Sequence, residues 1–162
     1  MIRAAMLVAI GCTPVAGTVA DGVLLSPTEG AKLAGQCSRQ SPAPVQGMWS
    51  PNKVQIGEME ALLPAFFRKQ AHDWRGFLRM PNITDADADY LLTQDVRQYA
   101  GFVVGGRKII YVNAVRGWGI SDAPNQWRTK AIQICDGGPI TFGVEFDPST
   151  KEFSHSAFNG AI

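Results

Sequence analysis

Residues 97–114 read RQYAGFVVGGRKIIYVNA, which places two strand-like runs on either side of Gly105-Gly106. Glycine adopts positive φ angles without strain, and a two-residue hairpin turn needs such angles. The pattern therefore predicts a β-hairpin whose strands cover residues 97–104 and 107–114.

Three further strands are expected after this hairpin. Residues 127–135 follow a loop rich in Gly, Pro and Asn, residues 140–146 alternate apolar and polar side chains, and residues 152–158 follow a turn at 147–150. Strict alternation is typical of a strand with one buried face. We expect an antiparallel meander of about five strands.

The region before the strands has apolar residues at helical spacing. Ser50 and Pro51 offer a capping hydroxyl and a proline suited to the first helical position. Apolar residues then recur at helical spacing: Ile56, Met59, Leu62, Leu63, Phe66, Phe67, Ala71, Trp74, Phe77 and Leu78. Because Pro64 has no backbone N–H to donate, a kink or a break into two helices is expected near Leu63.

A second helix is expected from Thr84 to near Asp95. Thr84 can cap it, and Asp85, Asp87 and Asp89 complement the helix dipole. Alternate acids also open calcium-binding loops, but the glycine and glutamate that such a loop needs further on are missing here. No metal site is predicted.

Helices followed by strands, without alternation of the two, indicate an α+β fold with N-terminal helices packed on the antiparallel sheet. Residues 51–162 are expected to form this single domain. Residues 21–50 are broken by several prolines and glycines, and we expect them to be an irregular tether. Residues 1–20 are expected to be a signal peptide.

The signal-peptide prediction rests on Arg3 followed by an apolar run that is too short to span a bilayer. The run ends in Ala9-Ile10-Gly11-Cys12, which resembles the lipobox of bacterial lipoproteins, whose cysteine is lipidated and becomes the new N-terminus. The alternatives are ordinary cleavage after Ala20 or Gly17, and an apolar element that is never removed. Location in the periplasm or anchored to the outer membrane through Cys12 is expected, with secretion as the alternative.

Removal of a leader containing Cys12 leaves Cys37 and Cys135 as an even pair in an oxidising compartment, where a disulfide is expected. Two buried free thiols are the alternative, and isolated cysteines lack the paired spacing of a zinc site. Removing residues 1–20 also removes Arg3, the one charged residue among them, and leaves 14 basic and 14 acidic residues. A neutral domain argues against nucleic-acid binding, and no cofactor is expected.

Four blocks of sequence resemble a family of small, uncharacterised exported (lipo)proteins of proteobacteria: 97–101, 110–113, 135–138 and 158–160. In addition, a helix wrapped by a meander resembles cystatin-like domains, and residues 142–153 resemble the hairpin of PepSY domains. The first resemblance implies export, and the other two concern only the shape of the domain. None of them implies an activity.

Catalysis by histidine would depend on His155, with Asp136, Asp147 or Glu145 as the orienting acid, although no Gly-x-Ser-x-Gly elbow is present. A strand histidine satisfied by its neighbours is the simpler interpretation. Four aromatic residues are candidates for an exposed binding surface, with burial in the core as the alternative: Trp118, Trp127, Tyr99 and Tyr111.

The sequence favours a non-enzymatic envelope protein that binds an envelope or secreted protein partner through its sheet face or the loop 115–126. The membrane would be reached through a lipid anchor at Cys12 alone. The second hypothesis is a small periplasmic hydrolase of cell-wall or peptide material that uses His155.

Overall fold

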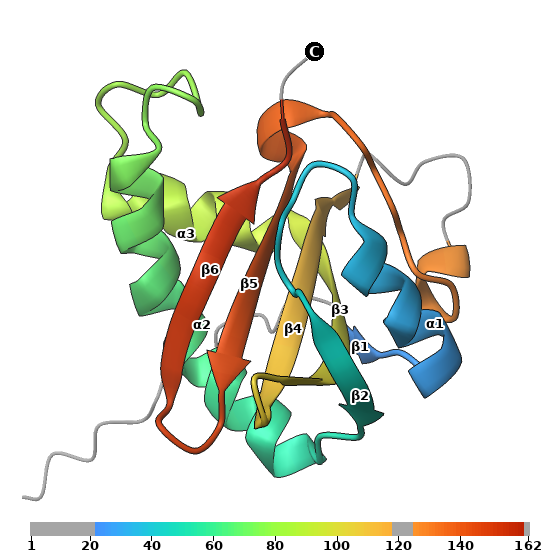
Figure 1. Ribbon diagram of the computed structural model, residues 1–162. Coiled ribbons are helices and arrows are strands. Elements are labelled where there is room, and N and C mark those ends of the chain that lie inside the picture. Colours follow the sequence, from blue (N-terminus) through green and yellow to red (C-terminus); the bar gives the residue numbers. More distant parts are fainter. Residues whose placement is uncertain (1–21, 118–124, 161–162) are drawn as a thin grey trace, which may run out of the picture.

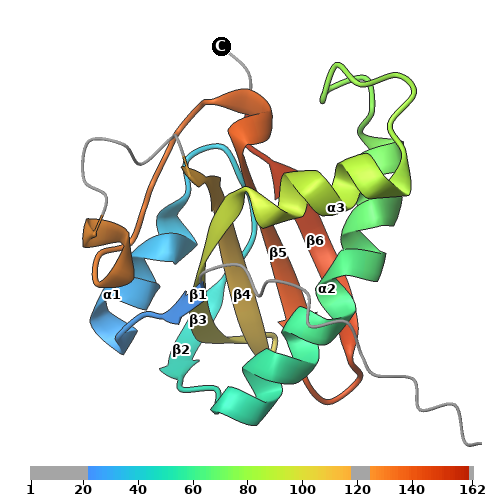
Figure 2. The same cartoon turned by 180° about the vertical axis from the view of Figure 1, so that it is seen from behind.

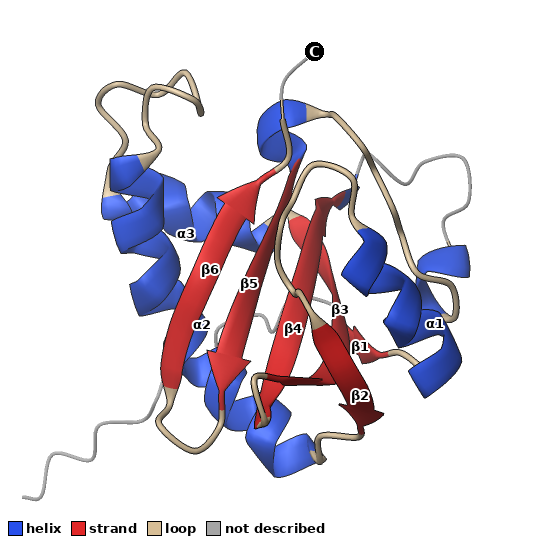
Figure 3. Ribbon diagram, viewed as in Figure 1, coloured by secondary structure: helices blue, strands red, loops and turns tan. Residues whose placement is uncertain are grey.

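The computed structural model describes residues 22–117 and 125–160. Within these residues a six-stranded mixed sheet forms the centre of an α+β fold (Figure 3). Its strands are β1 (Gly22–Leu24), β2 (Val45–Trp49), β3 (Asp95–Val104), β4 (Arg107–Arg116), β5 (Thr141–Asp147) and β6 (Glu152–Phe158). β3 to β6 pair antiparallel in sequence order, and the outer edge of β3 is shared between β1, which is parallel to it, and β2, which is antiparallel. The predicted fold class is confirmed.

The β3–β4 hairpin is the longest pairing of the sheet and confirms the first prediction. The register runs without interruption from Asp95 opposite Arg116 to Val104 opposite Arg107. Gly105 and Gly106 have φ angles of 57° and 75°, as the tight turn requires. The hairpin therefore begins two residues earlier than the sequence pattern indicated.

Two helices, α2 (Lys53–Asp73) and α3 (Asp85–Thr93), lie across one face of the sheet (Figure 2). The start of α2 differs from the prediction of Ser50 and Pro51. Asn52 is the N-cap instead, because its side chain accepts from the Gln55 amide while the Gln55 side chain accepts from the Asn52 amide, both at 2.9 Å. The predicted cap of α3 at Thr84 is confirmed, with Asp87 completing a capping box.

The expected break into two helices at Pro64 is wrong, since α2 is one helix through it. Leu63 and Phe67, on either side of Pro64, are buried against the sheet and hold both halves of the helix on the same core. The apolar contact outweighs the one backbone hydrogen bond that proline removes. This helix-side core also contains Met59, Ala71, Ile83, Ala88, Leu92, Tyr99, Ile110, Val112, Ala114, Phe142, Val144, Phe146 and Phe158.

Residues 21–50 are not the expected tether. They contain β1, β2, the short helix α1 (Pro27–Ala31) and the 3-10 helix η1 (Lys32–Gly35), and residues 36–44 cross the face of the sheet opposite α2 (Figure 1). Leu33 is fully buried there against Ala100 and Phe102 of β3. Prolines and glycines in this segment interrupt regular structure, but its apolar side chains still pack against the sheet.

Residues 127–135 do not form the predicted strand. They contain the end of the 3-10 helix η3 (Gln126–Arg128) and an irregular run that leads to the 3-10 helix η4 (Gly138–Ile140). The backbone carbonyls of this segment accept hydrogen bonds from buried amide side chains rather than from a neighbouring strand. Gln98 donates to the Trp127 and Lys130 oxygens, and Asn113 donates to the Ile132 oxygen. This segment covers β3 and β4 on the second face of the sheet. On the same face Arg39 and Ser41 lie against Gly143 and Glu145, so that β5 is buried on both faces rather than on one.

Candidate functional site

A groove of about 820 Å³ lies between α2, α3, β1 and the first half of β3. Its walls come from four elements that are far apart in the sequence. The residues that line it are Gly22, Leu24, Lys53, Ile56, Gly57, Glu60, Ala61, Pro64, Arg68, Asp89, Leu92, Thr93, Arg97 and Tyr99. This volume is within the range of sites that bind small molecules or peptide segments.

The floor of the groove is a buried ion pair. Arg97 binds the carboxylate of Glu60 through Nε at 2.9 Å and Nη2 at 2.8 Å, and the Tyr99 hydroxyl donates to the same carboxylate at 2.7 Å. The Arg97 side chain is 4% exposed and that of Glu60 is 15% exposed. Burial, together with the Glu60 charge, raises the pKa of Tyr99 well above its usual range. The charges of the floor therefore satisfy one another.

One end of the groove carries an ion pair, and the other end carries a single lysine. Arg68 and Asp89 pair through two contacts of 2.8 Å, and the hydrogen bond from Arg68 lowers the pKa of Asp89. At the other end Lys53 is exposed and has no ion pair among the described residues. The groove has one positive charge without a partner.

One face of α2 forms the long wall, since its lining residues from Lys53 to Arg68 recur at helical spacing. Fifteen residues of helix span about 22 Å. Gly57 and Ala61 leave the middle of this wall shallow, and a Cβ atom at Gly57 would meet no side chain of another described element within 4 Å. An elongated, mostly apolar groove suits an extended chain better than a compact ligand.

Sequence reasoning missed this site. It assigned the apolar stripe of α2 to the core, and of the residues that line the groove it named Tyr99 alone as a binding candidate. The available signal was Arg97, a charged residue within a strand that proves to be 3% exposed. Buried charges are commonly paired, but the sequence does not say that Glu60 is the partner of Arg97.

His155 lies beside Glu145, one of the three acids considered from the sequence. Its Nδ1 is 3.1 Å from Oε2 of Glu145, and the other carboxylate oxygen accepts from Ser41. The imidazole is 61% exposed, whereas the Glu145 side chain is 3% exposed. Asp147 bonds instead to Ser149, and Asn159 donates to the backbone oxygen of Asp136.

A local irregularity of β6 directs His155 toward solvent. The register shifts between Gly143 and Glu145 of β5, and His155 has a φ of 51°, an uncommon value for a residue other than glycine. The contact with Glu145 uses Nδ1 and leaves Nε2 for another group. Such an arrangement can act as a general base toward water or a bound substrate.

The four aromatic candidates do not form one exposed surface. Trp127 is 4% exposed and Tyr111 is fully buried, so both belong to the interior. Burial raises the pKa of Tyr111 to about 12. Tyr99 is part of the groove floor, and Trp118 lies outside the described residues.

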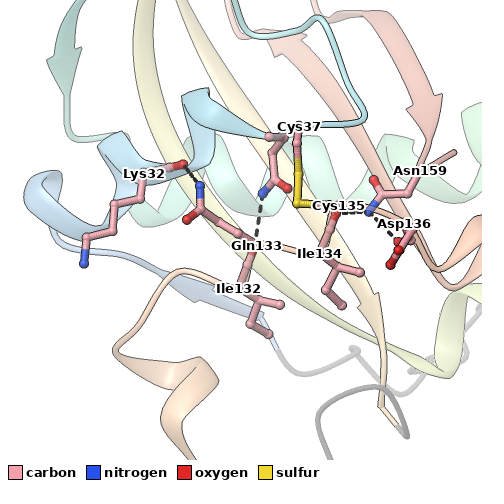
Figure 4. Close-up of a disulfide and its surroundings, with 9 residues drawn as sticks. Lys32, Cys37, Ile132, Gln133, Ile134, Cys135, Asp136 and Asn159 are labelled. Carbon is pink, nitrogen blue, oxygen red and sulfur yellow. Dashed lines mark hydrogen bonds between the residues drawn. A yellow bond between two sulfur atoms is a disulfide. The ribbon is translucent and has the colours of Figure 1, made fainter.

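Cys37 and Cys135 form the expected disulfide. As Figure 4 shows, it lies among contacts between the N-terminal segment and residues 132–136. The Gln133 side chain donates to the Lys32 oxygen at 2.6 Å, and Asn159 donates to the backbone oxygens of Ile134 and Asp136. The alternative of two buried free thiols is thereby excluded, while Cys12 and the predicted signal peptide lie outside the described residues.

In the part of the chain that the structure describes, no group of three or more His, Cys, Asp or Glu side chains is placed to hold a metal ion. No helix of residues 22–117 and 125–160 is long and apolar enough to cross a membrane. Comparison of the chain with protein families, curated proteins and solved structures finds no match.

Proposed function

We propose that this protein is an exported cell-envelope protein, lipid-anchored through Cys12, that binds an envelope or secreted protein partner without catalysing a reaction. The observation that carries the proposal is the groove beside α2, with its apolar walls and self-satisfied ionic floor. Apolar surface that stays open to solvent is a common mark of a binding site.

Export is supported by the disulfide, because such bonds persist in oxidising compartments. The mass of the exported protein tests this part of the proposal. Lipidation at Cys12 adds acyl chains to a chain that begins there, whereas ordinary cleavage leaves an unmodified N-terminus further on.

Two alanines of α2 provide a matched test of the groove. Ala61 lines the groove, while Ala65, one turn further along and also exposed, does not. In chemical cross-linking of envelope extract, Ala61→Phe is expected to reduce partner capture at least tenfold, because the ring fills the groove. Ala65→Phe should capture as the unchanged protein does, and both variants should keep its melting temperature. Equal capture by the two variants would show that the groove is not the binding site.

A second candidate function is hydrolysis of cell-wall or peptide material, favoured by the contact between His155 and the buried Glu145. Here Glu145 would orient the imidazole, and Nε2 would take a proton from the attacking water. His155→Ala should then abolish turnover of peptidoglycan or peptide substrates while the fold is kept. Turnover that survives this substitution excludes the role.

A further inference from the structure

Within residues 22–117 and 125–160, three strands of the sheet have an open edge, and two of them are irregular. β2 shifts register between Val45 and Gly47, and β6 shifts opposite Gly143 and Glu145. β6 is also preceded by Lys151 and begins with the charged residue Glu152. Bulges and charges of this kind discourage other strands from pairing with an exposed edge.

β1 is different. It pairs with β3 in continuous register, and its sequence, Gly22-Val23-Leu24, contains no charge or proline. Among the described residues, no other strand pairs with its outer edge. Leu24 is 38% exposed, one of the large apolar residues that the fold leaves open to solvent.

The direction of the backbone groups of β1 follows from one hydrogen bond. The Leu25 amide donates to the Tyr99 oxygen at 3.0 Å, so Leu25 faces β3. Because successive residues of a strand alternate in the direction of their backbone groups, Val23 also faces β3, and Gly22 and Leu24 direct theirs to the open edge. These two residues present donors and acceptors to which an added strand can bind.

Gly22 and Leu24 also line the groove. A strand added beside them would have its backbone along β1 and every second side chain over the apolar wall of α2. The unpaired charge of Lys53 at one end of the groove favours a segment that contains a carboxylate. Backbone pairing, an apolar face and a cation thus meet at one place.

We propose that the open edge of β1 takes up an extended segment of the partner protein as an added strand, with apolar side chains at alternate positions and an acidic residue toward Lys53. This inference rests on the proposed function and specifies the partner's chemistry. Main-chain hydrogen bonds would supply affinity, and the groove would select the alternate side chains.

The probe is a phage-displayed library of random twelve-residue peptides, panned on the full chain with its disulfide intact. Enriched sequences are expected to carry apolar residues at every second position and an acidic residue. A fluorescein-labelled copy of the most enriched peptide then provides the binding measurement by anisotropy. Enrichment at helical spacing, or no enrichment, overturns the proposal.

Two exposed leucines give the matched variants, Leu24 at 38% and Leu62 at 39% exposure. Leu24→Lys places a charge on the β1 edge and is expected to weaken peptide binding at least tenfold. Leu62→Lys, on α2 outside the groove lining, should change it less than twofold. Equal effects of the two substitutions overturn the proposal.

N-methylation of the peptide tests the backbone contact without altering the protein. Two peptides are compared, one methylated on its odd-numbered amides and one on its even-numbered amides. One of them should lose binding and the other should keep it, because only every second N–H of an added strand faces β1. If both peptides bind, no strand is added. If Ala61→Phe still blocks partner capture in that case, the groove remains the binding site and only the strand-addition mode fails.

The oligomeric state gives a further test. If the unchanged protein forms a dimer that Leu24→Lys dissociates, the β1 edge binds a second copy of this chain, and the proposal is overturned.

Discussion

The face of the sheet under α2 buries Met59, Leu63 and Phe67 from a single helix, whereas the opposite face is covered by residues 25–44 and 125–137, with one five-residue helix and short 3-10 turns. On the helix side, apolar residues at helical spacing supply the contact. On the opposite side, buried amides and an arginine bind backbone and each other, as in the 2.7 Å contact between Arg39 and Asn113. An irregular covering segment needs such long-range links because it has little hydrogen bonding of its own.

The disulfide is the strongest of these links, and its removal is the severest test of the comparison. Cys37 and Cys135 are 98 residues apart. Closing a loop of about 100 residues is worth about 4.7 kcal/mol in the chain-entropy model. Replacing both cysteines by alanine should therefore lower the free energy of unfolding in urea by about that amount. Reduction of the unchanged protein should give the same loss, and a loss below about 1 kcal/mol would mean that the irregular cover holds without the bond.

Two fully buried leucines compare the packing of the two faces, Leu63 under α2 and Leu33 in η1. Leu63→Ala is expected to cost about 4 kcal/mol and Leu33→Ala about 3 kcal/mol, since an irregular segment relaxes more readily into the cavity. Urea unfolding of both variants checks the order. A larger loss for Leu33→Ala would show that the irregular face is packed as rigidly as the helical one.

The buried Asp95 makes the free energy of unfolding depend on pH. Burial raises the pKa of Asp95 to about 6, against the opposing charges of Arg116 and Arg97. The folded protein thus holds this proton more tightly than the unfolded chain, so stability contributed by the protonated form is lost as pH rises from about 4 to 6. Two pH units correspond to about 3 kcal/mol.

Urea unfolding at several pH values measures this effect, and Asp95→Asn is the comparison. The difference in unfolding free energy between the unchanged protein and the variant should fall by about 3 kcal/mol across this range. Parallel curves for the two proteins would place the pH dependence in other carboxyl groups.

Short-range patterns were reliable where neighbouring residues decide the structure. The Gly105-Gly106 turn and the Thr84 cap depend on residues within a few positions of each other. The predictions for residues 21–50 and 127–135 were wrong because both segments are shaped by side chains from other elements, such as Gln98 and Asn113. Of the site, His155 and its carboxylate were anticipated as a candidate pair, while the groove was not.

Local interactions along the chain were enough to specify the hairpin, the cap of α3, the strands 141–147 and 152–158, and the α+β class. The disulfide was predicted from the even number of cysteines that removal of the expected signal peptide would leave. Tertiary contacts alone decided that α2 continues through Pro64, that β1 and β2 complete the edge of β3, and that Glu60 meets Arg97 across 37 positions. The physical reason is that each of these features depends on the burial of groups distant in sequence, which no local pattern encodes.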